Sequence, residues 1–145
     1  MTALVIDASV ALKWVLTEAG SDTAISLLTR EPDLLIPDFW LNEAANVTWL
    51  RARRGLLTPD EAKAAFDNVR DLIEPTPTAK LRLHDVALEI GLTIGHSPYD
   101  TLYVAFALAM GAKRLVVADA AFLTATRRHP DPRVATMVHP LSHWL

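Results

Sequence analysis

Residues 3–7 read Ala-Leu-Val-Ile-Asp, and this stretch decides the fold. A second stretch of the same kind, Leu-Val-Val-Ala-Asp, occupies residues 115–119. Both are continuous apolar runs that stop at an aspartate, as expected of central strands that are covered on both faces. Longer segments with helical periodicity lie between them. This alternation predicts βα units, and therefore an α/β fold with a mostly parallel central sheet.

The remaining elements follow from local signals around these two strands. Weaker strands are expected at residues 34–36 and 133–138. Caps, prolines and glycines predict where the helices begin and end, with Asp38 as one N-cap and Gly91 as one stop. The expected helices cover residues 10–16, 22–30, 39–54, 58–72, 79–90 and 97–111, with a short helix after residue 119.

Length and composition narrow the class of protein. A chain of 145 residues, 51% of them hydrophobic, favours a single domain over residues 1–145. It contains no cysteine, which excludes disulfides and thiolate metal sites and makes the reducing cytoplasm the expected compartment. The apolar stretch over residues 3–16 is shorter than the roughly 20 residues that span a bilayer. The net charge of −3 argues weakly against a broad nucleic-acid surface.

Two aspartates stand where the best strands end. Asp7 follows the first run and Asp119 follows the later one. Ligands of open parallel sheets bind beyond the carboxyl ends of the strands, so the two side chains can face each other there. Each aspartate could equally serve as the N-cap of the helix that follows it.

Two further acids lie on apolar helix faces. Glu43 shares its side of a helix with Phe39, Trp40 and Val47. Asp100 opens a helix whose residues 101–112 carry no charge, although a Ser-x-x-Asp capping box also explains an acid at this position. A carboxylate in apolar surroundings must be paired, protonated or bound to a cation.

Together the four acids predict a metal centre. If they converge, their mutual repulsion keeps at least one of them protonated unless a cation is bound. Mg²⁺ or Mn²⁺ prefers oxygen ligands and is commonly shared between carboxylates and a substrate phosphate. Such an ion activates water for hydrolysis of a phosphodiester. Without these four acids the chain has 13 acidic against 14 basic residues, so its apparent acidity is largely that of the candidate site.

At this point the chain resembles a known family. Its motifs, in order, are Val-Ile-Asp-Ala-Ser at 5–9, Glu-Ala-Ala-Asn at 43–46, Ser-Pro-Tyr-Asp-Thr-Leu-Tyr-Val-Ala at 97–105 and Leu-Val-Val-Ala-Asp-Ala-Ala-Phe at 115–122. They resemble the PIN-domain ribonucleases, in particular the VapC toxins of prokaryotic toxin–antitoxin pairs. The resemblance covers essentially the whole chain.

The resemblance implies a single-domain, three-layer α/β/α sandwich and Mg²⁺- or Mn²⁺-dependent endonucleolytic cleavage of RNA. It also implies that the matching acids are catalytic, with Asp7, Asp100 and Asp119 as metal ligands and Glu43 beside them. Ser9 and Asn46 match polar positions that support these acids. A homodimer and an antitoxin partner are also implied. The chain departs from the family at Val117, where a hydroxyl residue is frequent.

Several alternatives remain open. Arg51 and Arg54, near the end of the Glu43 helix, could contact RNA phosphates or simply complement the helix dipole. His96 precedes the Asp100 helix and could approach the metal, but a loop histidine with no spaced partner is more often incidental. The apolar edges of the helices over 39–54 and 58–72 could form a groove for a partner helix or belong to the core.

Two other functions remain open. A phosphatase that uses Asp7 as its nucleophile is disfavoured, because Ser9 stands where such enzymes usually have a second acid. A protein that binds a partner without catalysis is the other rival.

Overall fold

The computed structural model describes residues 3–31 and 33–144. Its centre is a sheet of four parallel strands in the order β2-β1-β3-β4. The strands are β1 (Leu4–Ile6), β2 (Leu34–Leu35), β3 (Arg114–Val117) and β4 (Val138–Pro140). Every residue of β1 is buried, as is most of β3, which agrees with their unbroken apolar sequences. The α/β fold with a parallel sheet is confirmed.

Helices connect and cover the strands. The α-helices are α1 (Ala8–Ala11), α2 (Ser21–Arg30), α3 (Trp40–Arg53), α4 (Pro59–Leu72), α5 (Leu83–Ile94), α6 (Pro98–Ala109), α7 (Ala120–Thr126) and α8 (Pro132–Ala135). Two 3-10 helices, η1 (Leu12–Trp14) and η2 (Leu141–His143), complete the described elements. No helix in the described part of the chain is long and apolar enough to cross a membrane.

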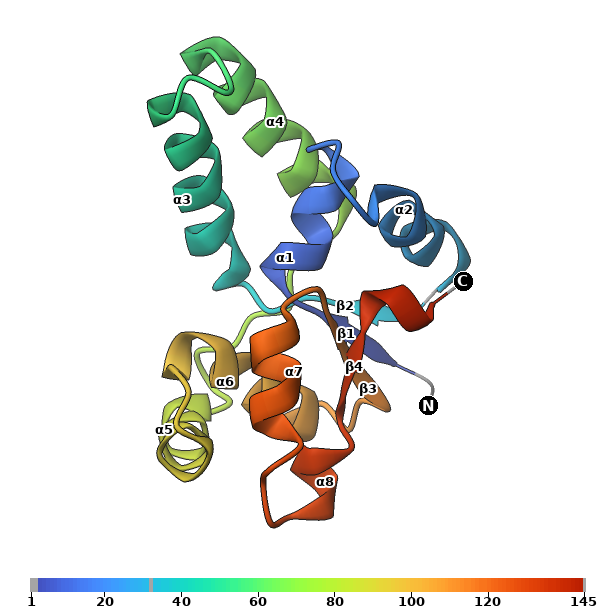
Figure 1. The fold of residues 1–145 in the computed structure, drawn as a ribbon, viewed down its shortest axis with the longest axis vertical. Helices are drawn as coiled ribbons and strands as arrows, with labels where there is room; N and C mark the ends of the chain where they lie inside the picture. Colours follow the sequence, from blue (N-terminus) through green and yellow to red (C-terminus); the bar gives the residue numbers. More distant parts are fainter. Residues whose placement is uncertain (1–2, 32, 145) are drawn as a thin grey trace.

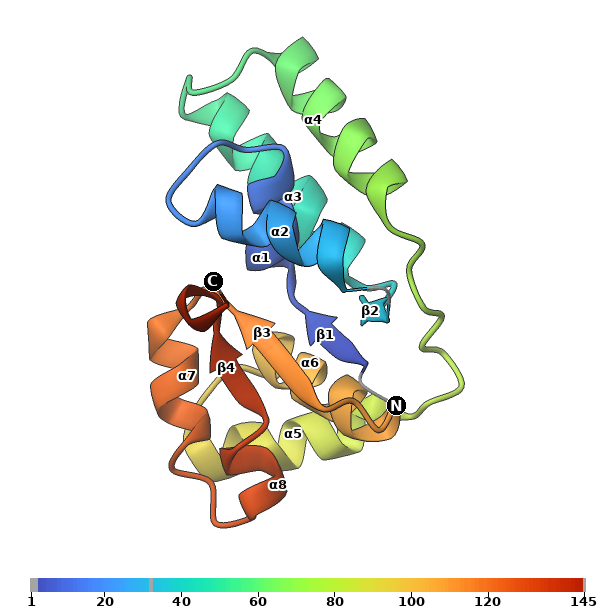
Figure 2. The ribbon, with the colours of Figure 1, turned by 90° about the vertical axis from the view of Figure 1, so that its right-hand side faces the viewer.

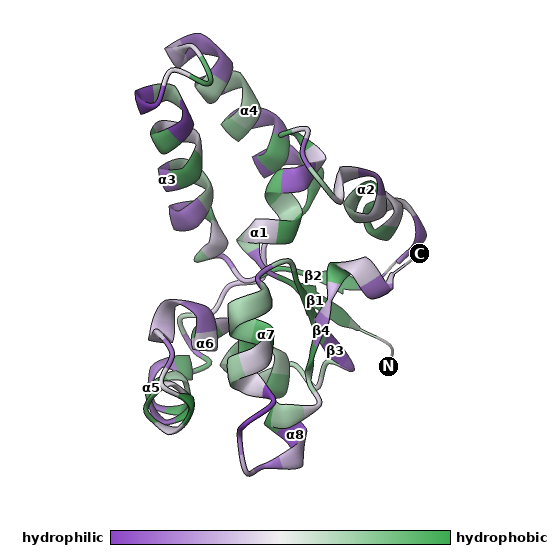
Figure 3. Ribbon diagram, in the orientation of Figure 1, coloured by the Kyte–Doolittle hydropathy of each residue, from purple (hydrophilic) through white to green (hydrophobic). Residues whose placement is uncertain are grey.

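The sheet separates two groups of helices. Figures 1 and 2 show α1 to α4 on one side of the strands and α5 to α8 on the other, with α3 and α4 extending away as a hairpin. In Figure 3 the strand β1 is coloured as hydrophobic, in line with its buried residues. Trp40, Tyr103, Phe106 and Phe122 are the largest fully buried side chains. They belong to the same hydrophobic core as the buried residues of β1 and β3.

Close packing of α5 against α6 fixes the position of α6. A Cβ atom on Gly91 would lie 2.7 Å from the backbone oxygen of His96, so only glycine allows this approach. The hydroxyl of Thr101 on α6 donates a 2.6 Å hydrogen bond to the backbone oxygen of Ala87 on α5. The prediction that Gly91 ends the helix was wrong: α5 continues to Ile94, and Gly95, at φ 68°, provides the left-handed stop.

Two other sequence predictions were wrong for local reasons. Residues 133–138 do not form one strand, because Asp131 caps α8 and Pro132 occupies its first turn, so that β4 begins only at Val138. Asp38 does not cap α3. Its carboxylate instead accepts hydrogen bonds from the backbone nitrogen and the hydroxyl of Thr78, which hold the segment before α5 against the start of α3.

Candidate active site

Asp7 lies at the point where β1 passes into α1. Only 7% of the residue is exposed. Its Oδ1 accepts a 2.6 Å hydrogen bond from the hydroxyl of Ser9 and a 3.2 Å bond from the backbone nitrogen of Val10. Asp7 is therefore the N-cap of α1, and its second carboxylate oxygen remains available for another role.

The Ser9 hydroxyl also connects two strands. While it donates to Asp7, it accepts a 3.3 Å hydrogen bond from the backbone nitrogen of Ala118, directly after β3. The chain reaches Asp119 one residue later. One side chain thus links the ends of β1 and β3, where Asp7 and Asp119 stand.

Three of the four predicted acids influence one another electrostatically. Burial raises the pKa of the Asp7 carboxyl from 3.8 to about 7, and the nearby charges of Glu43 and Asp100 add to the rise. The hydrogen bonds that Asp7 accepts act in the opposite direction. Burial also raises the pKa of Glu43, and Asp100 contributes to that shift. Asp7, directly after β1, therefore meets residues of α3 and α6 in one carboxylate cluster.

Tyr103 adds a buried polar atom to this cluster. Burial raises the pKa of its phenol, and the neighbouring charges of Glu43 and Asp7 raise it further. The hydroxyl lies close to Glu43 without the geometry of a hydrogen bond, and among the described residues it has no partner. The rings of Phe39 and Tyr103 pack edge to face, with 5.0 Å between their centroids. The sequence pattern assigns Tyr103 no role, although it shares a helix face with Asp100.

His96 contacts the cluster through Asp100. Its Nε2 lies 2.7 Å from Oδ2 of Asp100, and its ring packs on Phe122 of α7. The expectation that this histidine is incidental was wrong. The spacing of four residues between His96 and Asp100 could have suggested the contact, but the sequence does not show that the loop before α6 folds back to make it.

Asp119, unlike Glu43 and Asp100, is not among the charges that shift the pKa of Asp7 or Glu43. It is the N-cap of α7, and its Oδ1 accepts hydrogen bonds from the backbone nitrogens of Ala121 and Phe122. Its side chain is exposed at the end of β3. Asp7, Asp100 and Asp119 share one pattern: their hydrogen bonds to other described residues engage only one carboxylate oxygen of each.

The predicted convergence on one ion is incomplete. Within residues 3–31 and 33–144, no three His, Cys, Asp or Glu side chains are arranged to hold a metal ion. Asp119 instead caps α7, and Asp100 contacts His96 in the loop before α6. The chemistry of the cluster nevertheless fits a hard divalent cation. Its donors are all oxygens, one carboxyl is buried with a raised pKa, and the Tyr103 hydroxyl has no described partner.

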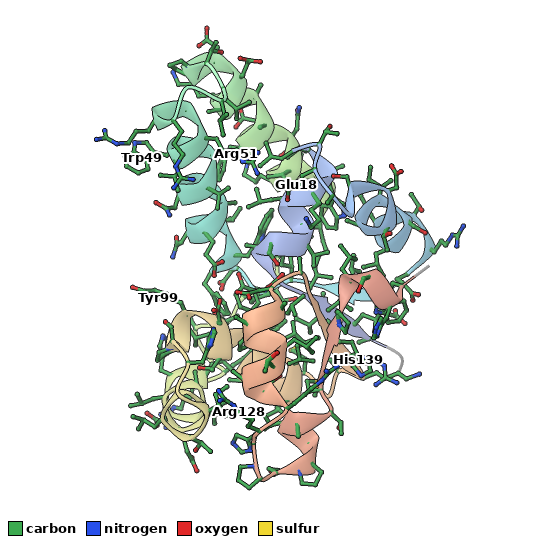
Figure 4. The ribbon with its side chains drawn as sticks, in the orientation of Figure 1. Glu18, Trp49, Arg51, Tyr99, Arg128 and His139 are labelled. Carbon is green, nitrogen blue, oxygen red and sulfur yellow. The ribbon has the colours of Figure 1, made fainter. Side chains whose placement is uncertain are left out.

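The polar residues predicted around the acids have distinct positions. Asn46 makes no hydrogen bond to Glu43 in the described structure, and its amide instead lines a neighbouring pocket. Arg51 is paired with Glu18 at 2.6 Å, and Glu18 also binds Lys13 at 3.1 Å (Figure 4). The Arg51 guanidinium therefore ties α3 to the segment after η1. Arg54 is exposed at the C-cap of α3.

Comparisons with known proteins identify the family and the fold of the chain. A family model described as PIN domain matches residues 4–127, a span that includes all four acids. Ribonuclease VapC3 from Pyrobaculum aerophilum is 31% identical over 120 residues, which cover 79% of this chain and 88% of that protein. The crystal structure of PAE2754 from the same organism superposes with a TM-score of 0.69 at 21% identity, covering 98% of this chain and 85% of the other, and supports the fold alone. The chain belongs to the PIN domain family.

Proposed function

We propose that this protein is a metal-dependent endoribonuclease, acting as the toxin of a VapBC-type pair, with the reducing cytoplasm as its expected compartment. The observation that carries the proposal is the buried carboxyl of Asp7, held beside Glu43 and Asp100 at the end of a central strand. A carboxyl in this environment is costly to ionise unless a cation is bound. The relationship to ribonuclease VapC3 supports RNA as the substrate.

Each residue has a definite task in this mechanism. Asp7, Asp100 and Asp119 would hold Mg²⁺ or Mn²⁺ through the carboxylate oxygens that their described hydrogen bonds leave available. When bound, the ion supplies an acidified water and offsets negative charge on the phosphate. Glu43, whose pKa is raised, accepts the proton of the attacking water at its carboxylate. Ser9 and His96 hold Asp7 and Asp100 in place.

The test is cleavage of single-stranded RNA by the purified protein with Mg²⁺ or Mn²⁺, compared with the same reaction in EDTA. We expect cleavage only with the metal, and its loss by at least 100-fold in Asp7→Asn and in Asp100→Asn. Circular dichroism checks that both variants stay folded, and Glu89→Gln, an exposed acid of α5, is the control for charge. Cleavage that persists in EDTA refutes the metal mechanism. Metal binding without cleavage of cellular RNA favours the interaction protein.

We infer that an antitoxin helix occupies the groove between α3 and α4. This groove, of about 750 Å³, has apolar walls that include Ala52 and Phe66, and Trp49 lies at its side with 56% of the residue exposed. An amphipathic helix is a suitable occupant of such a groove. The product of a small reading frame beside this gene is the partner to coexpress. Trp49→Ala should weaken that complex about tenfold while RNA cleavage by the free protein stays unchanged; unchanged binding would contradict this assignment.

We also infer a homodimer. Leu88 and Leu92 lie one helical turn apart on α5. Leu88 is 52% exposed and Leu92 is 77% exposed. An exposed apolar stripe of this kind is typical of a protein interface. Light scattering after gel filtration should give twice the chain mass of 15.9 kDa, and Leu92→Glu should give the monomer. A monomeric wild type contradicts the inference.

A further inference from the structure

A pocket of about 610 Å³ adjoins the carboxylate cluster and shares Glu43 with it. Its walls come from α3, from the first residues of α5 and α6, and from the segment before α5. Phe39, Val47 and Leu102 supply apolar surface. A concave, mostly apolar site of this size with a few polar groups is typical of a small-ligand site.

Two side-chain amides of this pocket make no hydrogen bond within the described part of the protein. Asn42 and Asn46 lie one turn apart on the exposed side of α3, and both line the pocket. Among the described residues neither amide has a hydrogen-bond partner. A side-chain amide carries two donors and one acceptor, so it can pair with the edge of a heteroaromatic ring that presents both kinds of group.

An aromatic side chain stands at the edge of the pocket. Tyr99 is the second residue of α6 and is directly followed by Asp100. It is 78% exposed, and Figure 4 shows its side chain projecting outward from the start of the helix. Exposed aromatic rings of this kind are the platforms on which proteins stack unpaired bases of single-stranded nucleic acids.

The charges of the pocket disfavour an anionic group as its main ligand. No lysine or arginine is among its described lining residues, and their titratable basic or acidic side chains are the imidazole of His84 and the carboxyl of Glu43. A phosphate would therefore meet a carboxyl and a single imidazole there. A flat, neutral ring with hydrogen-bonding edges meets aromatic, apolar and amide surfaces instead.

We propose that this pocket receives one unpaired nucleobase of the RNA, next to the bond that is cleaved, with Tyr99 stacking on the base and the amides of Asn42 and Asn46 contacting its edge. The inference rests on the proposed ribonuclease function and extends it to sequence preference. Because Glu43 belongs to both the pocket and the carboxylate cluster, a base held here positions the adjoining phosphodiester at the acids.

The test measures RNA binding separately from cleavage. The probe is a fluorescently labelled, single-stranded 2′-O-methyl RNA of mixed sequence, bound in EDTA and followed by anisotropy, together with copies that carry one abasic residue at each position. One abasic position should weaken binding to the wild type about 5- to 100-fold, which is the range expected from the loss of one stacked base. In the Tyr99→Ala variant, the same abasic residue should leave the RNA affinity almost unchanged.

Matched variants separate stacking from other effects. Tyr99→Phe keeps the ring and should bind like the wild type, whereas Asn46→Ala should relax the base preference at the same position. Leu56→Ala, an exposed apolar residue at the turn after α3 and outside this pocket, should change nothing. In Mg²⁺, the sites cut in a randomised RNA should lose their preference at one flanking position in Tyr99→Ala.

The outcomes distinguish this inference from the ribonuclease proposal. Position-specific binding loss in a protein that cleaves no RNA supports the pocket and refutes the nuclease. RNA cleavage with a flat abasic scan, or with unchanged binding by Tyr99→Ala and Asn46→Ala, refutes the pocket and leaves the nuclease intact. If Tyr99→Ala alters only the oligomeric state, a second copy of the chain covers this face and the inference is wrong.

Discussion

Replacing Asp7 by asparagine should stabilise the metal-free protein, although it abolishes the proposed activity. The folded protein binds a proton at Asp7 more tightly than the unfolded chain does, because burial raises the pKa of this carboxyl from 3.8 to about 7. Proton binding at Asp7 therefore contributes its full stabilisation of the folded protein below about pH 3.8. This stabilisation is lost as the pH rises through about 7. Above that range the wild type folds with a buried, ionised carboxylate, whereas the asparagine variant does not.

The size of the effect follows from the same shift. Each pKa unit corresponds to 1.36 kcal/mol, so the change from 3.8 to about 7 sets an upper limit of about 4 kcal/mol. Asparagine weakens the charge-assisted hydrogen bonds that Asp7 accepts from Ser9 and Val10, at a cost of about 1 kcal/mol each. The net gain in the free energy of unfolding should be about 1–3 kcal/mol at pH 8, and near zero at pH 5.

Urea unfolding in EDTA, followed by circular dichroism at both pH values, measures this difference. Glu89→Gln removes the same charge from an exposed position and should give a difference close to zero at both pH values. If Asp7→Asn is no more stable than the wild type at pH 8, or if the wild type shows no loss of stability between pH 5 and pH 8, the Asp7 carboxyl is not destabilised by its burial.

Three further substitutions probe neighbouring features. Ser9→Ala removes a hydrogen bond that lowers the pKa of Asp7. In urea unfolding it should therefore lower the free energy of unfolding by about 1–2 kcal/mol at pH 8 and by less at pH 5. An equal loss of stability at both pH values would contradict this reason. Gly91→Ala places a Cβ 2.7 Å from a backbone oxygen. It should lower the free energy of unfolding by about 1–3 kcal/mol, which is seen as a lower Tm. An unchanged Tm would show that α5 and α6 can move apart freely. Arg51→Met breaks the partly exposed pair with Glu18 and should cost at most about 1 kcal/mol, with RNA cleavage unchanged; a large loss of cleavage at unchanged stability would instead make Arg51 an RNA contact.

The sequence is most informative where local patterns decide the structure. The apolar runs before Asp7 and Asp119 predict two buried parallel strands, and β1 and β3 indeed pair, with Val5 opposite Leu115. Glu43 and Asp100 are recognisable because a charge on an apolar helix face is conspicuous, and both lie in the carboxylate cluster.

Contacts between distant segments are not predictable in the same way. Glu18 meets Arg51 across 33 positions, and neither residue has a local feature that names its partner. The sequence predicts the start of α5 too early, because Arg82 adopts a left-handed conformation at φ 52° just before the helix, which no motif marks. Gly91 reads as a helix stop in isolation, and only its contact with the loop before α6 shows that it serves helix packing.

The Ser9 hydroxyl, which joins Asp7 to the backbone after β3, has a consequence for the whole sheet. A change in core packing that alters the twist between β1 and β3 would lengthen one of its two hydrogen bonds, which measure 2.6 Å and 3.3 Å. A longer bond to Asp7 would leave its charge less stabilised. Substitutions deep in the core, far from any substrate, are therefore expected to change the acidity of the site before they change the fold.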